Sequence, residues 1–199
     1  MQAVILAAGR GTRMEELTTA VPKPMLLVDG KTLLEHKLDA LPDEIQKVVI
    51  IVGHLSDVIK MQYKSTYRGR TLTYVEQTDL NGTAGALWAA KDVLEDRFLV
   101  LNGDDIFTSE DLKTCAEESD SWKLLVQQMP EMHRAGSVEL DENANIAGII
   151  EGDLGVGTGL ASTNMFALDK RLFTQPLIPK QEGSLEYGLP QTVIAAAKA

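Results

Sequence analysis

The sequence predicts a three-layer α/β fold of the Rossmann-like type, with a mostly parallel central sheet and a smaller antiparallel portion. Short, almost continuously apolar runs alternate with stretches of helical spacing up to about residue 128. Strands that are apolar on both faces are typical of parallel sheets covered by helices on both sides. From about residue 130 the pattern changes, and two short strands flank the turn at residues 141–143. That hairpin predicts antiparallel pairing at one end of the sheet.

The expected strands follow from apolar runs bounded by turn residues. The run Lys47–Val52 is the clearest, since five apolar residues precede Gly53. In chain order, strands are expected at residues 3–7, 47–52, 72–75, 97–101, 123–128, 137–140, 145–151 and 159–168. The glycine-rich stretch 152–159 is expected to be a loop.

The expected helices follow from apolar residues at helical spacing. The first, 32–41, places leucines at 33, 34, 38 and 41 and stops before Pro42. Ser56 is the expected N-cap of the second helix, and Asn81 or Thr83 that of the third. In chain order, helices are expected at residues 32–41, 56–63, 83–94, 109–118 and 189–199.

Length and composition predict one soluble domain over residues 1–199. The net charge of −10 argues against a broad nucleic-acid or membrane surface. A single cysteine, Cys115, and the lack of a signal-peptide pattern predict a cytoplasmic protein. The chain ends on a helix without a capping residue, which fits either a natural terminus or a C-terminally truncated domain. The sequence leaves a homo-oligomer open.

The exit of the first strand carries the most informative motif. Leu6-Ala7-Ala8-Gly9-Arg10-Gly11-Thr12-Arg13 is a small-residue turn with two arginines. Such a backbone can bring N–H groups close to phosphate oxygens, while arginine offers a planar fork of donors. It is neither a dinucleotide fingerprint, since Met14 replaces the third glycine, nor a P-loop.

A lysine between two prolines follows this turn. Pro22 and Pro24 flank Lys23, and we expect them to exclude helix and to hold the ammonium on a stiff, extended segment. Together with Arg10 and Arg13, Lys23 forms a local basic cluster in an acidic chain. The cluster predicts a polyphosphate-binding site.

The two motifs and their spacing resemble the sugar-1-phosphate nucleotidylyltransferases, also called nucleoside-diphosphate-sugar pyrophosphorylases. The resemblance is strong to about Phe107 and looser beyond it. It implies that the loop 9–13 wraps the triphosphate of a nucleotide bound by residues 6–12. It also implies that Arg13 and Lys23 are catalytic and stabilise charge on the phosphates. The implied reaction joins the triphosphate to a sugar 1-phosphate and releases pyrophosphate, with Mg²⁺ as cofactor.

The stretch 76–85 is the expected base-reading element. The resemblance implies that Gln77, Gly82 and Thr83 bind the nucleotide. A side-chain amide can accept from the N3–H of uracil or thymine and donate to a ring carbonyl, whereas guanine suits a carboxylate better. This favours UTP or dTTP over GTP, although the neighbouring Glu76 supplies a carboxylate.

Asn102-Gly103-Asp104-Asp105 follows an apolar strand at the edge where ligands of open α/β sheets bind. Mg²⁺ is held by one or two carboxylates together with substrate phosphates. The resemblance assigns the metal to Asp104 and leaves Asp105 as a helix-cap or loop residue. It also implies a second metal ligand from a later strand, and this chain ends before that point.

The sugar-side residues rest on the resemblance alone. Gly136 and Glu151 match a strand glycine and a hydroxyl-binding glutamate, and Ser162 stands where relatives have asparagine. Asn164 could take that place only with a two-residue slip. Many relatives have lysine where this chain has Gly152.

The substrates expected from these residues are a nucleoside triphosphate and a sugar 1-phosphate, with no nucleic-acid or membrane partner. Two alternatives remain open at this point. One is a non-catalytic nucleotide-binding or sensor domain, which the missing second metal ligand favours. The other is nucleotidyl transfer to another phosphate, such as phosphocholine.

Overall fold

The computed structural model describes residues 1–9, 11, 21–132, 136–151 and 157–199, without the side chain of Glu151. The helices are α2 (Leu33–Ala40), α3 (Ser56–Tyr63), α4 (Thr83–Ala89), α5 (Ser109–Ala116) and α6 (Leu189–Ala197), with 3₁₀ turns η2 (Lys23–Met25) and η3 (Lys170–Thr174). The strands are β1 (Gln2–Ala7), β2 (Leu27–Val28), β3 (Lys31–Thr32), β4 (Lys47–Val52), β5 (Thr66–Tyr67), β6 (Arg70–Glu76), β7 (Arg97–Asn102), β8 (Lys123–Met129), β9 (Gly136–Leu140), β10 (Ile146–Glu151) and β11 (Gly159–Asp169).

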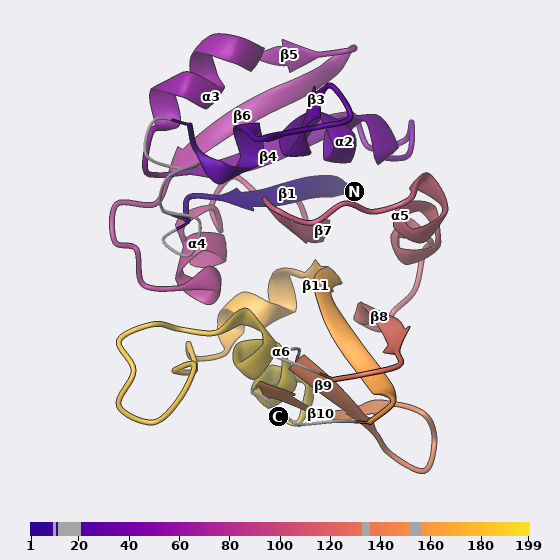
Figure 1. Cartoon of the computed structure of the whole chain (residues 1–199). Coiled ribbons are helices and arrows are strands. Elements are labelled where there is room, and N and C mark those ends of the chain that lie inside the picture. The colour runs from indigo at the N-terminus through magenta and orange to yellow at the C-terminus, as the bar shows by residue number, and fades with distance from the viewer. Residues whose placement is uncertain (10, 12–20, 133–135, 152–156) are drawn as a thin grey trace.

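One mixed sheet organises the molecule (Figure 1). Its strand order is β10-β9-β11-β7-β1-β4-β6-β5, and β8 pairs with β11 outside this path. The pairs β7-β1, β1-β4 and β4-β6 are parallel, so Ile5 lies between Ile50 and Leu101. β11 pairs with β7 in antiparallel orientation. β8 and β9 pair with β11, and β10 pairs with β9, so the rest of the sheet is antiparallel. The predicted fold class is confirmed.

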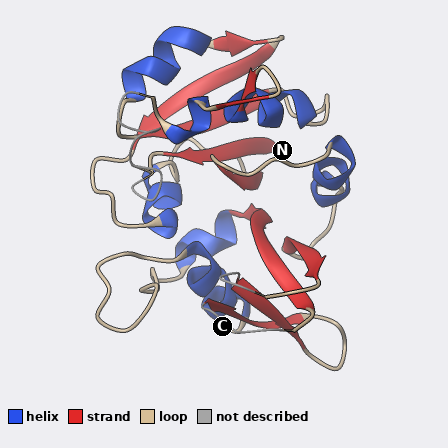
Figure 2. Cartoon of the chain, in the orientation of Figure 1, coloured by secondary structure: helices blue, strands red, loops and turns tan. Residues whose placement is uncertain are grey.

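The core forms two layers because successive strand residues point to opposite faces. Along β1, Ile5 packs with α2, α3 and α5, whereas Val4 packs with α4 and α6. The predicted hairpin is β9 and β10, with Asp141 accepting from the backbone N–H of Asn143 and Asn145. Figure 2 shows the strands of this second part grouped with the C-terminal helix. Within the described residues, no helix is long and apolar enough to cross a bilayer.

Two local expectations near the site and at α3 were wrong. The segment around Lys23 is not extended: Lys23–Met25 forms a 3₁₀ turn closed by Met25 N–H on Pro22 O at 2.8 Å. The proline φ angle near −65° suits the first residues of a helical turn, so proline starts this one instead of excluding it. Ser56 is not an N-cap; Leu55, with φ of 57°, precedes α3 and makes no side-chain cap bond.

The helices expected at 83–94 and 109–118 end earlier, at Ala89 and Ala116. Alanine-rich spacing continues past Ala89, but the chain turns there to reach β7. The other long helices and strands begin and end close to their expected positions.

Candidate functional site

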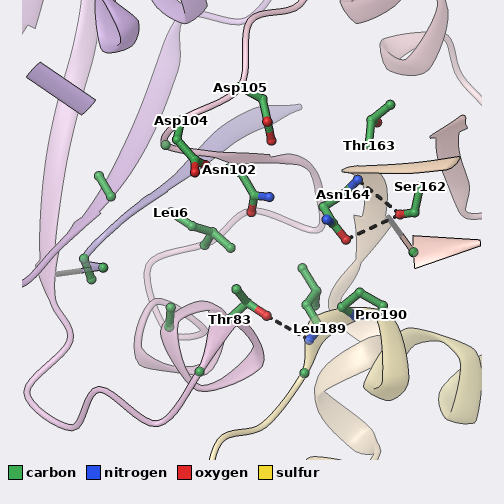
Figure 3. A pocket seen from close by; sticks show the side chains of 18 of the residues that line it. Leu6, Thr83, Asn102, Asp104, Asp105, Ser162, Thr163, Asn164, Leu189 and Pro190 are labelled. Carbon is green, nitrogen blue, oxygen red and sulfur yellow. Dashed lines mark hydrogen bonds between the residues drawn. The ribbon is translucent and has the colours of Figure 1, made fainter. Parts of the chain in front are cut away.

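A cavity of about 1940 Å³ lies at the carboxyl ends of β1 and β7, between the parallel and antiparallel parts of the sheet. Its walls come from the exit of β1, the 77–83 loop, the 102–105 turn, β11 and the segment 186–190. In Figure 3, Asn102, Asp104 and Asp105 lie on one side, and Ser162 and Asn164 on the other. Thr83 and Leu189 lie below these groups in the view.

Gly103 brings the acidic turn against the first strand. Its N–H donates to Leu6 O at 2.9 Å, and a Cβ at this position would lie 2.6 Å from that oxygen and 3.0 Å from Pro24. No side chain fits there. The close approach places Asp104 beside η2, although the two segments are far apart in sequence.

Lys23 and Asp104 form an ion pair at the mouth of the cavity. Their side chains are 31% and 37% exposed, so solvent reaches both. The structure therefore brings together the predicted phosphate-binding lysine and the predicted metal ligand. Leu6, Ala7, Ala8, Gly9 and Gly11 line the same cavity. Arg10, Thr12 and Arg13 lie outside the described residues, and their predicted roles stay predictions.

Asp105 lies in the loop and does not cap α5. That cap is Thr108, whose hydroxyl accepts from Asp111 N–H in a capping box. Asp105 is half-buried and makes a side-chain hydrogen bond with Asn102. Burial, and then the charge of Asp104, raise the pKa of its carboxyl.

Lys37 is a charged neighbour that the sequence reasoning missed. It is fully buried on α2, and its ammonium donates to Leu33 O at 3.2 Å. Burial lowers its pKa to about 8, while the charges of Asp105 and Asp104 oppose that shift. A signal existed: Lys37 occupies the apolar stripe of its helix, four residues after Leu33 and four before Leu41.

Gln77 is held at the end of β6. Its backbone N–H donates to Val52 O at 2.8 Å, and its side chain is buried against the 81–82 loop. Nε2 donates to Asn81 Oδ1 at 3.1 Å and to Gly82 O at 3.2 Å. Gln77, Gly82 and Thr83 all line the cavity.

The expectation that Asn81 or Thr83 caps α4 was wrong. The N-cap residue is Gly82, which has no side chain, and its φ of 97° is a conformation that glycine adopts without strain. The Asn81 side chain instead accepts from Gln77, and Thr83 Oγ1 accepts from Leu189 N–H at 3.0 Å. These side chains serve tertiary contacts, which local capping patterns do not reveal.

The segment before α6 forms a wall of the cavity that the sequence reasoning also missed. Tyr187 N–H donates to Asn81 O at 2.7 Å, and Tyr187 O accepts from Ala84 N–H at 3.1 Å. These bonds dock the C-terminal part on the 81–84 loop. A contact between residues about a hundred positions apart leaves no local pattern in a single sequence.

The predicted sugar-side residues lie on neighbouring strands. Gly136 and Glu151 are directly paired across β9 and β10, and Ala161 of β11 pairs with Ser137. Gly136, Ser162 and Asn164 line the cavity, while the Glu151 side chain lies outside the described part. Asn164 N–H donates to Ser162 Oγ at 3.2 Å, so the two cavity-lining side chains lie together.

The fold and the cavity define the class of protein. It is an α/β domain with a candidate ligand site at the carboxyl ends of parallel strands, where a lysine and a carboxylate form an ion pair. The family model described as nucleotidyl transferase matches residues 2–180, and the chain belongs to that family.

Known proteins agree with this assignment. The chain is 31% identical to the UTP–glucose-1-phosphate uridylyltransferase AglF of Haloferax volcanii, over 97% of this chain and 82% of the relative. It is also 31% identical to the bifunctional protein GlmU of Methanocaldococcus jannaschii, over 87% of this chain but 41% of that relative. The inositol-1-phosphate CTP transferase from T. maritima shares the fold, with a TM-score of 0.79 at 23% identity and coverage of 99% and 81%.

Proposed function

We propose that this protein transfers a nucleotidyl group from a nucleoside triphosphate to a sugar 1-phosphate. The observation that carries the proposal is the meeting of Lys23 and Asp104 at the mouth of the cavity, beside the exit of β1. A phosphate oxygen of the sugar phosphate attacks the α-phosphorus, the bond from that phosphorus to the bridging oxygen of the β-phosphate breaks, and pyrophosphate leaves. The attacking group is already an anion at neutral pH, so no general base is required.

The Lys23–Asp104 pair is a resting arrangement that substrate exchanges for new contacts. Partly exposed ion pairs contribute about 1 kcal/mol or less, so a triphosphate can displace Asp104 from Lys23 at little cost. Lys23 is then free to neutralise the α-phosphate and the incoming phosphate. Placing a fixed cation where two anions meet is the kind of electrostatic stabilisation that phosphoryl transfer needs.

The acidic turn fits Mg²⁺ in its donor chemistry. Asp104, Asp105 and Asn102 supply hard oxygen atoms at one strand end, which suit this cation. Within the described part of the chain, no group of three or more His, Cys, Asp or Glu side chains could hold a metal alone. Asp104 would therefore share the ion with substrate phosphates, and Mg²⁺ would offset their negative charge.

UTP or dTTP is the proposed nucleotide, for two reasons. Gln77 lines the cavity, and its side-chain oxygen can accept from the N3–H of uracil or thymine. Glu76, the carboxylate that would suit guanine, is bound to Lys60 and is not among the cavity-lining residues. Adjacent residues along a strand point to opposite faces, which explains why Gln77 lines the cavity and Glu76 points away from it. AglF, named for UTP, supports the same choice.

A pyrophosphate-release matrix tests the proposal. UTP, dTTP, CTP, GTP and ATP are each combined with a panel of sugar 1-phosphates, with phosphocholine, and with no acceptor. We expect release with UTP or dTTP only when a sugar 1-phosphate is present. If pyrophosphate were released with phosphocholine and with no sugar 1-phosphate, phosphocholine would be the acceptor. Nucleotide binding without pyrophosphate release would indicate a sensor domain.

Two variants belong in the same experiment. Lys23→Ala should lower the rate by roughly 10² to 10³, the usual effect of losing a transition-state charge contact. Lys91→Ala removes an exposed lysine and should leave the rate unchanged. Equal rates for Lys23→Ala and the unaltered protein would remove Lys23 from the reaction.

A further inference from the structure

The amide of Gln77 has a fixed orientation. Its Nε2 donates to Asn81 Oδ1 at 3.1 Å and to the backbone oxygen of Gly82 at 3.2 Å. The Gly82 oxygen can only accept, so it determines which end of the Gln77 amide is nitrogen. With both amide protons engaged, Oε1 is the end of the side chain that is left for a ligand.

Asn81 holds its position because residue 85 is glycine. A Cβ on Gly85 would lie 1.8 Å from Asn81 Oδ1 and 2.5 Å from its Cγ, so the carboxamide lies directly over the Gly85 backbone. Tyr187 N–H holds the Asn81 backbone oxygen at 2.7 Å. Asn81 is therefore packed from two sides while it accepts from Gln77.

We propose that Asn81 is a specificity-determining positioning residue. The Gly82 oxygen orients the Gln77 amide, and Asn81 accepts its second proton, so that only Oε1 is left for the base and a base that donates a ring N–H is selected. Uracil and thymine donate from N3, and guanine donates from N1. Cytosine and adenine present a lone pair at the equivalent ring nitrogen, which would face the lone pairs of Oε1. The inference rests on the proposed function. It narrows the range of bases that the site would accept, through the contact between Asn81 and Gln77.

The test compares nucleotides of matched size by direct binding, with no acceptor present. Dissociation constants for UTP and CTP, and for GTP and ATP, are measured by calorimetry on the full chain. The unaltered protein should bind UTP more tightly than CTP and GTP more tightly than ATP. Asn81→Leu removes the acceptor, frees one Gln77 proton and should reduce the UTP-to-CTP preference about tenfold, the order expected for one hydrogen bond.

Two further variants separate positioning from damage to the fold. Asn81→Asp keeps an acceptor in the same place and should retain the preference for UTP over CTP. Its added charge should weaken the binding of all four nucleotides equally. Gly85→Ala displaces the Asn81 side chain while adding a better helix former, so the preference should fall as in Asn81→Leu with α4 intact.

The outcomes are distinct. A preference that is absent in the unaltered protein, or unchanged in Asn81→Leu, overturns the inference. An equal loss of affinity for all four nucleotides in Asn81→Leu assigns Asn81 a purely structural role and also overturns it. Because binding is measured without a sugar phosphate, failure of the proposed reaction would appear separately, as nucleotide binding without pyrophosphate release.

Discussion

At the scale of single residues, Lys37 shows how a charge placed near the site lowers the stability of the fold. The side chain is fully buried, and its pKa is lowered from 10.5 to about 8. The charged, protonated form of Lys37 is therefore less favourable in the folded protein than in the unfolded chain, and this difference lowers the free energy of unfolding. Its neighbours of opposite charge, Asp105 and Asp104, recover part of this loss.

Replacing Lys37 should stabilise the protein in a pH-dependent way. Between pH 8 and 10.5 the unfolded chain binds more protons at Lys37 than the folded protein does, so the stability of the unaltered protein rises with pH there. Lys37→Met should therefore be more stable by up to about 3 kcal/mol below pH 8, at about 1.4 kcal/mol per pKa unit. The advantage should shrink as pH rises to 10.5. Urea denaturation at several pH values measures it.

The exposed Lys91→Met variant is the control, since it removes a charge from the surface. Its stability difference from the unaltered protein should show no such pH window. A Lys37→Met variant that is less stable than the unaltered protein at pH 7 would contradict the argument.

At the scale of elements, β11 carries a strained position in its middle. Its register against β8 shifts between Ser162 and Phe166, and Asn164 within that irregularity has φ of 55°. Thr163 Oγ1 donates to Leu125 O at 2.8 Å and helps to fix the bulge. Asparagine tolerates this left-handed backbone better than most residues do, and strain of this kind concentrates at ligand sites.

Substitutions at Asn164 should separate backbone strain from side-chain function. Asn164→Gly accepts the positive φ, so we expect stability to be unchanged or raised by up to about 1 kcal/mol. Asn164→Val should lose about 2 kcal/mol, because a β-branched residue tolerates this backbone poorly. Chemical denaturation midpoints compare the two. A glycine variant less stable than the valine variant would show that the side chain, and not the backbone, dominates here.

At the scale of the whole molecule, residues 186–190 dock on the start of α4 and form one wall of the cavity. Three hydrogen bonds join the segments: Tyr187 N–H donates to Asn81 O, Leu189 N–H donates to Thr83 Oγ1, and Ala84 N–H donates to Tyr187 O. Gly82 permits this approach, since a Cβ there would lie 2.4 Å from Tyr187 O. The close contact between the 81–84 loop and residues 186–190 therefore depends on the missing side chain of Gly82.

Gly82→Ala should break this joint. We expect a loss of more than about 2 kcal/mol, from the positive φ together with a backbone collision, and faster proteolysis within 180–188. Gly69→Ala is the matched control, because Gly69 has φ of 85° but nothing within 4 Å of its Cβ position. That variant should lose only about 1 kcal/mol. Equal losses in the two variants would mean that the collision with Tyr187 relaxes freely.

The sequence alone determined the alternating architecture and pointed to Lys23 and Asp104 as candidate site residues. Buried strands are recognisable because each is an apolar run, and the carboxyl ends of parallel strands meet at one edge. The place of Asp104, just after β7, follows from that rule. Lys23 was singled out by the basic cluster beyond β1, and the proposed roles of both residues rest on the family resemblance. These properties are local or follow from the topology of the sheet, so they can be predicted from one amino-acid sequence.

Only the tertiary structure decided which neighbours these residues have. The orientation of the Gln77 amide depends on Asn81 and on the missing side chain at Gly85. Lys37 is buried near the acidic turn because α2 packs against the strands, and Tyr187 contacts the 81–84 loop from the far end of the chain. Such contacts arise from packing between segments distant in sequence, where no periodic pattern records which side chain meets which.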